Sequence, residues 1–300
     1  MKNNLVYHYT STDTFWHLIE SIKDSKDKDS FIFRATHVFF MNDPQEFIYG
    51  QKILENVFFE IESELDIDDE YKLSILLNEA DKMNSDRDKS LLNYLKNQNE
   101  MPFVISFSRL EDNLPMWLNY GNGGKGINLV FEDNRNQPFK VKFIDGKRVP
   151  YESFYTSDVY YSDIPKDSSL YKLIYDTMKD YKKDIDDGIA IEPEIYLDAL
   201  VQIAAPLIKT SYYENEKEAR VFKSVAYDFL GDVGKIEFRF NGYNNLVPYI
   251  GIEIPVNQLK AVRIGPLANY ELTRMAIELM KKRYNLQFDI LSSKVQYREY

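Results

Sequence analysis

A histidine and a threonine stand where a short apolar stretch gives way to a helical pattern. Residues 7–10 read Tyr-His-Tyr-Thr, and apolar residues at helical spacing follow. Because a strand-to-helix corner gathers side chains and backbone N–H groups at one mouth, His8, Tyr9 and Thr10 form a candidate nucleotide-binding segment. The alternative is a surface histidine at the end of a strand, with Thr10 as the cap of the helix.

A pair of serines lies on a predicted strand in the middle of the chain. Ser106 and Ser108 flank a phenylalanine, so their hydroxyls point to the same face of the strand. Residues 116–121 follow with Met-Trp-Leu-Asn-Tyr-Gly, which adds the hydroxyl of Tyr120. The alternative is an ordinary edge-strand face beside a core tryptophan.

A run of charges is found at residues 214–220, which read Glu-Asn-Glu-Lys-Glu-Ala-Arg. If this segment is a strand, Glu216, Glu218 and Arg220 share one face. An arginine close to a carboxylate keeps it ionised. A carboxylate that faces a cleft stabilises an oxocarbenium-like centre or orients a sugar hydroxyl. The alternative is a solvated charge run on an exposed edge strand.

Two further segments carry turn residues. Residues 42–46 read Asn-Asp-Pro-Gln-Glu, which is typical of a turn that starts a helix, and the alternative is a loop that lines a cleft. Residues 121–126 are rich in glycine but lack the spacing of a phosphate-binding loop, so we expect a flexible hairpin turn there.

Composition narrows the chemistry that the chain can carry. Its 300 residues include no Cys and three His, which excludes disulfides, thiolate zinc sites and cysteine nucleophiles, and we expect no metal. The net charge is −11, which disfavours general binding to nucleic acid. The longest apolar run, near 199–208, is too short to span a bilayer, and we see no secretion signal. We therefore expect a cytoplasmic bacterial protein that does not associate with membranes.

The apolar pattern predicts the elements that must position these side chains. Strands are expected at 5–9, 31–35, 102–108, 127–131, 218–223, 235–240, 247–254, 259–264 and 287–291. Helices are expected at about 11–22, 47–61, 114–120, 170–181, 195–208 and 270–284.

The order of these elements favours the α+β class, because runs of strands and clustered helices replace a regular strand–helix alternation. No linker or repeat divides the chain, so we expect a single domain over residues 1–300. Within it we expect a charged helical insertion at about 60–100 and a helical pair at about 166–208. The insertion either binds a partner or is a solvated helical face.

The order of the polar segments resembles a bacterial family known mainly as a domain of unknown function. The motifs that carry the resemblance are Tyr-His-Tyr-Thr, Asn-Asp-Pro-x-Glu, Ser-Phe-Ser, Met-Trp-x-x-Tyr-Gly and Glu-x-Glu-x-Arg, and a strand ending in Ile-Gly-Pro at 264–266 closes the series. Together they span nearly the whole chain. The family's description assigns no activity.

The first and fifth of these motifs also resemble those of ADP-ribosyltransferases. The resemblance implies a mixed or antiparallel split sheet with NAD as the substrate. It implies that His8 bonds the adenosine ribose, that the backbone of Tyr9 holds the nicotinamide carboxamide and that Thr10 completes the motif. It also implies that Glu218 bonds the ribose 2′-hydroxyl and stabilises the ribosyl cation. Glu216 would position or deprotonate the acceptor.

This sequence combines features of two branches of that superfamily. A Ser-x-Ser strand, here Ser106 and Ser108, usually accompanies an opening arginine, whereas the histidine-opened branch carries a middle tyrosine, here Tyr120. The middle position stays open among these three residues. Tyr9 also stands where glycine is usual, which narrows the pocket.

Three hypotheses for the function follow. The first is an NAD-consuming ADP-ribosyltransferase or NAD glycohydrolase, in the setting of a bacterial toxin or phage-defence effector, with an unknown acceptor and a protein partner or antitoxin as further expectations. Arg34, Lys125 and Arg220 are the candidates to meet the charge of NAD. The second hypothesis is a non-catalytic nucleotide-binding or sensor module.

The third hypothesis is a metal-dependent nuclease that uses Asp43, Glu46, Glu216 and Glu218. The acidic pI of about 4.9 and the lack of a basic stripe disfavour it.

Overall fold

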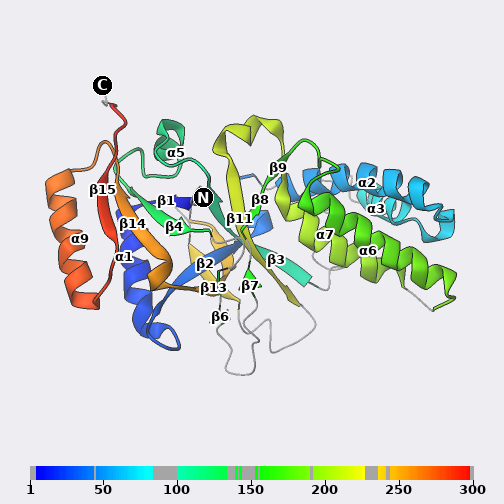
Figure 1. Cartoon of the computed structure of the whole chain (residues 1–300), viewed down its shortest axis with the longest axis horizontal. Coiled ribbons are helices and arrows are strands. Elements are labelled where there is room, and N and C mark those ends of the chain that lie inside the picture. Colours follow the sequence, from blue (N-terminus) through cyan, green and yellow to red (C-terminus); the bar gives the residue numbers. More distant parts are fainter. Residues whose placement is uncertain are drawn as a thin grey trace.

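A mixed β-sheet forms the centre of the molecule, and helices gather at its two ends (Figure 1). The computed structural model describes residues 5–43, 45–83, 100–133, 139–140, 142–143, 153–154, 156–189, 192–226, 236–240 and 244–297. The predicted α+β class is confirmed. Within the described part of the chain, no helix is long and apolar enough to cross a membrane.

The elements lie close to where the apolar pattern predicts them. The strands are β1 (Leu5–Thr10), β2 (Ser30–His37), β3 (Glu100–Ser108), β4 (Ile127–Glu132), β5 (Phe139–Lys140), β6 (Lys142–Phe143), β7 (Ser153–Phe154), β8 (Ser157–Asp158), β9 (Tyr160–Tyr161), β10 (Ile208–Lys209), β11 (Glu218–Ala226), β12 (Glu237–Phe240), β13 (Leu246–Pro255), β14 (Leu259–Ile264) and β15 (Asp289–Ser292). The α-helices are α1 (Thr12–Ser21), α2 (Glu46–Leu65), α3 (Leu73–Met83), α5 (Leu114–Asn119), α6 (Ser169–Asp186), α7 (Pro193–Ala204) and α9 (Tyr270–Tyr284).

The main sheet is antiparallel apart from one pair of strands. Its order is β12-β13-β2-β3-β1-β4-β14-β15, and β14 and β15 are the parallel pair. The strand β11 pairs with β3 along its whole length, from Glu218 opposite Ser108 to Ala226 opposite Glu100. The short strands β6 and β8 add to β13 and β11.

The sheet divides along one edge of β3. On this edge β2 pairs with β3 at Val104 and Phe103, whereas β1 pairs with it at Ser108. Between these two points, residues 105–107 have no strand partner on that edge among the described residues. The strands β1 and β2 therefore separate, and a gap opens between two halves of the sheet.

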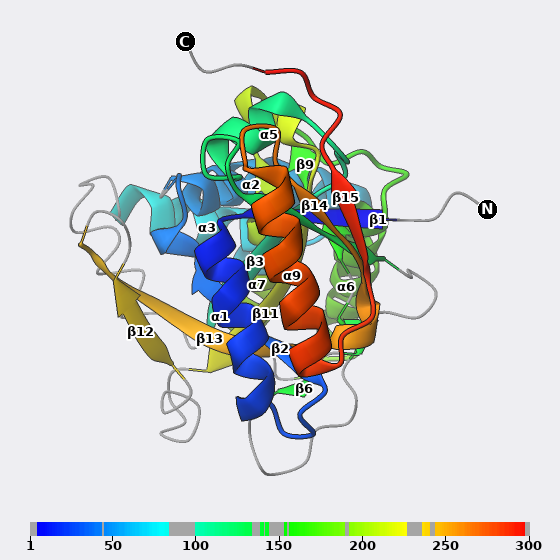
Figure 2. The ribbon, with the colours of Figure 1, turned by 90° about the vertical axis from the view of Figure 1, so that its left-hand side faces the viewer.

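Side-chain alternation gives the sheet one apolar face. Phe33, Phe107 and Phe131 pack against one another with ring centroids about 6 Å apart and belong to a buried core that α1 and α9 cover. These two helices lie side by side in Figure 2. The ring centroids of Trp16 on α1 and Tyr284 on α9 are 6.5 Å apart. Because neighbouring residues of a strand point to opposite faces, the polar residues of β2 and β3 face away from this core.

The helix α1 begins where the sequence predicts it. Ser11 caps the helix, because its hydroxyl accepts a hydrogen bond from the Thr14 N–H at 3.0 Å. Phe15, Leu18 and Ile19 then recur at helical spacing and are buried against the sheet. The cap fixes the direction in which the chain leaves β1.

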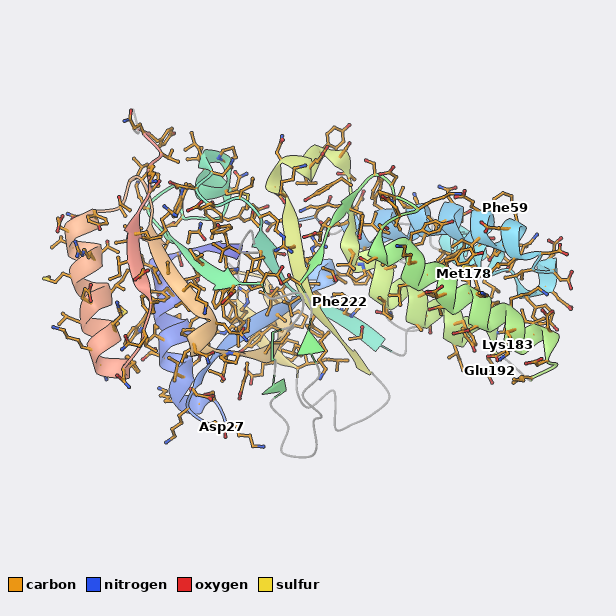
Figure 3. The ribbon with its side chains drawn as sticks, in the orientation of Figure 1. Asp27, Phe59, Met178, Lys183, Glu192 and Phe222 are labelled. Atoms are coloured by element: carbon orange, nitrogen blue, oxygen red, sulfur yellow. The ribbon has the colours of Figure 1, made fainter. Side chains whose placement is uncertain are left out.

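The helices α2, α3, α6 and α7 form a second apolar cluster at the other end of the sheet (Figure 1). Met178 is fully buried between these helices, whereas Phe59 lies on the outer surface of α2 (Figure 3). Phe222 of β11 packs against the cluster and connects it to the sheet. The helices expected at 166–208 correspond to α6 and α7. Of the expected insertion at 60–100, the structure describes the end of α2 and all of α3, and residues 84–99 lie outside the described residues.

The glycine-rich turn at 121–126 differs from the flexible hairpin that the sequence predicts. Its backbone bonds to itself and to the end of β14, because Gly126 N–H donates to Gly121 O at 2.8 Å and Gly265 N–H donates to Gly126 O at 3.0 Å. A Cβ atom at Gly126 would lie 2.2 Å from Thr10 O. The turn is therefore packed tightly under the end of β1.

We expect Gly126→Ala to lower the free energy of unfolding by about 1–3 kcal/mol, because the added methyl overlaps a backbone oxygen that has little room to move. Urea unfolding followed by circular dichroism measures the change. Gly123→Asn is the matched control in the same turn, since no atom lies within 4 Å of a Cβ there and asparagine tolerates its positive φ of 64°. Equal effects of the two substitutions would contradict the prediction.

Candidate functional site

A cleft of about 960 Å³ opens where β1 and β2 separate. Its walls come from β1, α1, β2, β3, the end of α5 and the start of β11, so it follows the gap in the sheet. The volume is at the upper end of the range of small-molecule sites, which is roughly 300–1,000 Å³. Segments far apart in the sequence thus share one concave surface.

The cleft brings together most of the residues that the sequence singles out. Those that line it are His8, Tyr9, Thr10, Arg34, Asp43, Glu46, Ser106, Ser108, Tyr120, Glu216 and Glu218. Arg220 is not among the lining residues, because its side chain is 0% exposed beneath the carboxylates.

His8 reaches the cleft from the gap beside β3. Its Nδ1 lies 2.9 Å from Ser106 O, and its ring packs edge-on against Phe33 with centroids 5.4 Å apart. Burial lowers the pKa of His8, and the hydrogen bond to the carbonyl opposes the shift only in part. A neutral ring that donates from Nδ1 keeps a lone pair on Nε2, so His8 is equipped to accept a hydrogen bond from a ligand hydroxyl.

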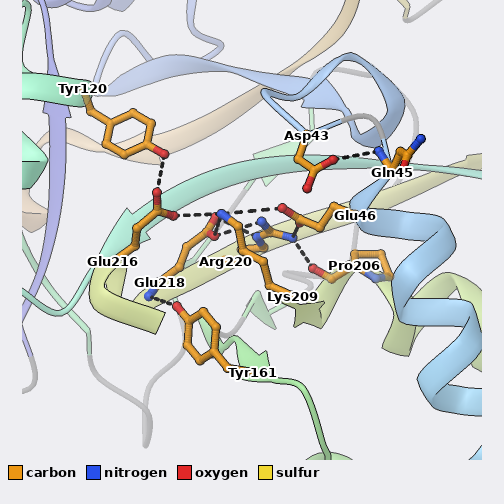
Figure 4. Close-up of polar contacts among 10 residues, drawn as sticks. All are labelled: Asp43, Gln45, Glu46, Tyr120, Tyr161, Pro206, Lys209, Glu216, Glu218 and Arg220. Atoms are coloured by element: carbon orange, nitrogen blue, oxygen red, sulfur yellow. Dashed lines mark hydrogen bonds and ion pairs between the residues drawn. The ribbon is translucent and has the colours of Figure 1, made fainter. Parts of the chain in front are cut away.

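Five charged side chains form a buried network at the other end of the gap (Figure 4). Arg220 donates from Nε to Glu218 Oε1 at 2.7 Å and from Nη2 to Glu218 Oε2 at 2.9 Å. It also donates to Pro206 O and pairs with Glu46. Such a bidentate contact fixes both position and orientation of the Glu218 carboxylate.

Lys209 is the second cation of this network. Its Nζ lies 2.8 Å from Glu216 Oε2, 3.0 Å from Glu218 Oε2 and 3.5 Å from Glu46 Oε2. The same ammonium lies 4.4 Å from the centroid of the Tyr213 ring. Burial alone would lower the pKa of Lys209, but the three carboxylates outweigh burial and raise it. Lys209 therefore stays charged and joins all three acidic residues.

Glu218 is ionised throughout the physiological range. Burial would raise its pKa, but Arg220 and Lys209 outweigh that effect and lower the pKa to about 2. A carboxylate accepts about four hydrogen bonds, and Arg220 and Lys209 use three of these positions. These three bonds leave one acceptor position on Oε1 of Glu218.

Glu216 is more accessible than Glu218, with 12% against 6% of the side chain exposed. Its Oε1 accepts the Tyr120 hydroxyl at 2.6 Å, and burial, together with this bond, raises the pKa of Tyr120. Tyr120 is therefore a neutral donor at neutral pH. The contact places Tyr120, at the end of α5, beside the carboxylate pair.

The strand predicted at 218–223 begins at Glu218, as expected, but the residues before it are not part of the strand. Glu216 is the last residue of a 3₁₀ helix (Ser211–Glu216), and β11 starts at Glu218. Between them Lys217 adopts a left-handed conformation with φ of 43°. The prediction that Glu216 lies on the same strand face as Glu218 and Arg220 is therefore wrong. The contact of both carboxylates with Lys209 brings Glu216 close to Glu218 instead.

The two serines share a face, as predicted, but they differ in their contacts. Ser108 Oγ donates to Glu216 O at 2.6 Å and accepts from Leu110 N–H at 3.0 Å, so it holds the turn that precedes β11. Ser106 Oγ is buried and makes no hydrogen bond of normal geometry to a described residue, although it lies close enough to Glu218 to help lower the pKa of that carboxyl. The Ser106 hydroxyl is thus buried beside the Glu218 carboxylate.

The network has two members, Glu46 and Lys209, that the resemblance to ADP-ribosyltransferases does not include. Asp43 Oδ1 accepts from Gln45 N–H at 2.9 Å, and this turn starts α2 with Glu46 as its first residue. Pro44 lies outside the described residues. A lysine that ends an apolar run is the sequence signal for Lys209, because a buried ammonium requires carboxylate partners.

The three cations proposed for the charge of NAD have different positions. Arg34 is exposed on β2 and lines the cleft, whereas Lys125 lies in the glycine-rich turn and is not a lining residue. Arg220 is enclosed by its own partners, so its predicted contact with a cofactor is replaced by a role in orienting Glu218. Arg239 of β12, which the sequence does not single out, lines the cleft with Arg34.

Three of the four carboxylates of the nuclease hypothesis are bonded to cations of the protein itself, whereas Asp43 accepts from the Gln45 N–H. Glu46, Glu216 and Glu218 all contact Lys209. Within the described ranges, no group of three or more His, Asp or Glu side chains is arranged to hold a metal ion.

We expect the stabilising effect of Glu218 to be lost in acid. Its pKa is lowered from 4.5 to about 2 in the folded chain, so its contribution is complete above about pH 4.5 and declines as the pH falls toward 2. At pH 7, Glu218→Gln should lower the free energy of unfolding by about 3–5 kcal/mol, the usual effect of breaking a buried ion pair. Urea unfolding of both proteins from pH 7 to pH 3 measures the difference, and a difference that stays constant down to pH 3 would contradict the prediction.

Comparison with known proteins finds a family match for the part of the chain that carries the carboxylate end of this site. No curated protein and no solved structure matches the chain. The predicted resemblance to a domain of unknown function is confirmed for one segment, which contains Tyr120, Lys209, Glu216 and Glu218. Residues 116–221 match the family model described as protein of unknown function (DUF2971).

Proposed function

We propose that the chain binds NAD in the cleft and cleaves its nicotinamide–ribose bond, as an ADP-ribosyltransferase or an NAD glycohydrolase. One observation carries the proposal: the gap in the sheet places His8 of β1 and the carboxylates Glu216 and Glu218 in the same cleft. His8 is about two hundred positions from the two carboxylates in the sequence. The resemblance to ADP-ribosyltransferases requires the histidine and the carboxylates to lie in one cleft.

The cleft suits an extended dinucleotide for three reasons. Its volume of about 960 Å³ is large for a small-molecule site. His8 offers a neutral acceptor for a ribose hydroxyl. Among the described residues, the part of β1 that follows Tyr7 pairs with no strand on the side of β3. The backbone N–H and C=O groups of that edge are therefore left for an amide, such as the nicotinamide carboxamide.

The proposed reaction breaks the bond between ribose C1′ and the nicotinamide nitrogen. The electron pair of that bond leaves with nicotinamide, whose ring becomes neutral, and C1′ develops positive charge. The ionised Glu218 stabilises this charge and accepts a hydrogen bond from the 2′-hydroxyl. An acceptor, which is water in the hydrolytic case, bonds to C1′ and loses a proton, and Glu216 positions it.

The contacts of Glu218 favour a second candidate function, nucleotide binding without turnover. Arg220 and Lys209 already neutralise much of its charge and take three of its acceptor positions. A sensor module needs the cleft and His8 but not a free catalytic carboxylate. The two functions differ in one measurable product, free nicotinamide.

We expect the purified protein to release nicotinamide from NAD and Glu218→Gln to reduce the rate at least a hundredfold, because the amide carries no charge for the cationic centre. Chromatography of the reaction mixture quantifies nicotinamide. Assays run well below the unfolding temperature of each variant, which thermal denaturation establishes. The matched control is Glu62→Gln, a buried carboxylate in the helical cluster that bonds Ser74 and not the cleft.

Two results would reject the enzymatic proposal. One is that saturating NAD yields no nicotinamide, and the other is that Glu218→Gln keeps the activity of the wild type. If NAD raises the unfolding temperature without releasing nicotinamide, the sensor function replaces it.

We expect His8→Gln to raise the KM for NAD about tenfold and to change kcat by less than about threefold, since a ribose contact far from C1′ is equal in the ground state and the transition state. Initial-rate kinetics separate the two constants. His37→Gln serves as a control, because His37 at the end of β2 is buried and is not a lining residue of the cleft. A fall in kcat with an unchanged KM would place His8 at the reacting bond instead.

A further inference from the structure

Two arginines lie together on the polar face of β2 and β12, away from the carboxylate network. Arg34 and Arg239 both line the cleft. Tyr249 of β13 stands between their strands, opposite Thr36 on one side and Glu237 on the other. The Arg34 guanidinium carbon lies 5.3 Å from the centroid of the Tyr249 ring. Arg239 Nη2 donates to Thr36 Oγ1 at 3.2 Å.

Neither guanidinium is neutralised within the described part of the chain, where no carboxylate forms an ion pair with Arg34 or Arg239. The nearby Glu237 accepts the Tyr249 hydroxyl instead. Arg239 Nε is buried and has no hydrogen-bond partner among the described residues. Burial and the charge of Arg34 also lower the pKa of Arg239, which indicates that the pair is strained by its own repulsion.

Repulsion between two neighbouring cations is relieved by an anion that contacts both. Arginine presents several donors in a planar fork that matches the oxygens of a phosphate. The cleft is otherwise dominated by acidic side chains, such as Asp13, Asp43 and Glu216, so an anion is drawn to this one place. Arg34 is exposed to the cleft and lies opposite Gly251, which has no side chain.

We infer that Arg34 and Arg239 form a subsite for the phosphate groups of a nucleoside diphosphate. The cleft then has two distinct ends: the arginine pair binds the anionic part of the ligand, and the network of Glu216 and Glu218 faces its uncharged or cationic sugar end. This inference deepens the proposed function, because it gives the direction in which a dinucleotide lies. The binding of phosphate itself does not depend on turnover.

Isothermal titration calorimetry with three probes tests the subsite: ADP, adenosine and inorganic pyrophosphate. We expect ADP to bind the wild type at least tenfold more tightly than adenosine, and pyrophosphate to compete with ADP. Arg239→Gln and Arg34→Gln should each weaken ADP about tenfold or more, the range expected for loss of charged hydrogen bonds, and should leave adenosine unchanged. Arg274→Gln, on the exposed surface of α9, is the matched control and should change neither.

The inference is overturned if ADP binds no more tightly than adenosine, if ADP shows no binding at millimolar concentration, or if both arginine variants bind ADP like the wild type. Should Arg239→Gln fail to fold, Arg34→Gln decides, because its side chain is exposed. Arginine-dependent binding of ADP without release of nicotinamide from NAD keeps the subsite and rejects the enzymatic proposal. If ADP does not bind and neither arginine variant changes the release of nicotinamide, the subsite is rejected and the enzymatic proposal is kept.

Discussion

The guanidinium of Arg220 is the constraint on which the candidate site depends. It is fully buried, and a buried charge is tolerated only when it is paired and hydrogen-bonded. Its partners come from three elements, with Glu218 on β11, Glu46 at the start of α2 and the carbonyl of Pro206 after α7. The sheet and the helical cluster are therefore joined at one charged centre, and the orientation of Glu218 follows from it.

The division of the sheet provides the space in front of this centre. Because β1 and β2 pair with β3 at different points, the chain leaves a gap where a continuous sheet would place backbone. His8 enters the gap from β1 and Ser106 from β3, and the carbonyl of Ser106 holds the imidazole. The buried aromatic face, covered by α1 and α9, supports the gap from behind. An interruption of strand pairing thus opens the cleft.

Charge is distributed unevenly along the cleft, and this distribution links the two proposals. Glu46, Glu216 and Glu218 outnumber Lys209 and Arg220 at one end, whereas Arg34 and Arg239 meet no carboxylate within the described residues at the other. A ligand with a phosphate end and a sugar end complements both. The same contacts that keep Glu218 ionised also occupy most of its acceptor positions, so the proposed binding of a nucleotide and the proposed turnover of that nucleotide place different demands on this site.

The sequence by itself predicted most of the elements, and most of the site residues that it singled out line the cleft. Local periodicity and caps such as Ser11 predict strands and helices because each depends on neighbouring residues. It also singled out His8, Tyr120 and Glu218 by type and order. Only the tertiary structure decided that Arg220 is a buried support, that Lys209 and Glu46 complete the network, and that Glu216 ends a 3₁₀ helix. These outcomes depend on contacts between segments that are far apart in the sequence. Burial at those contacts decides which charges must pair, and a local sequence pattern does not contain this information.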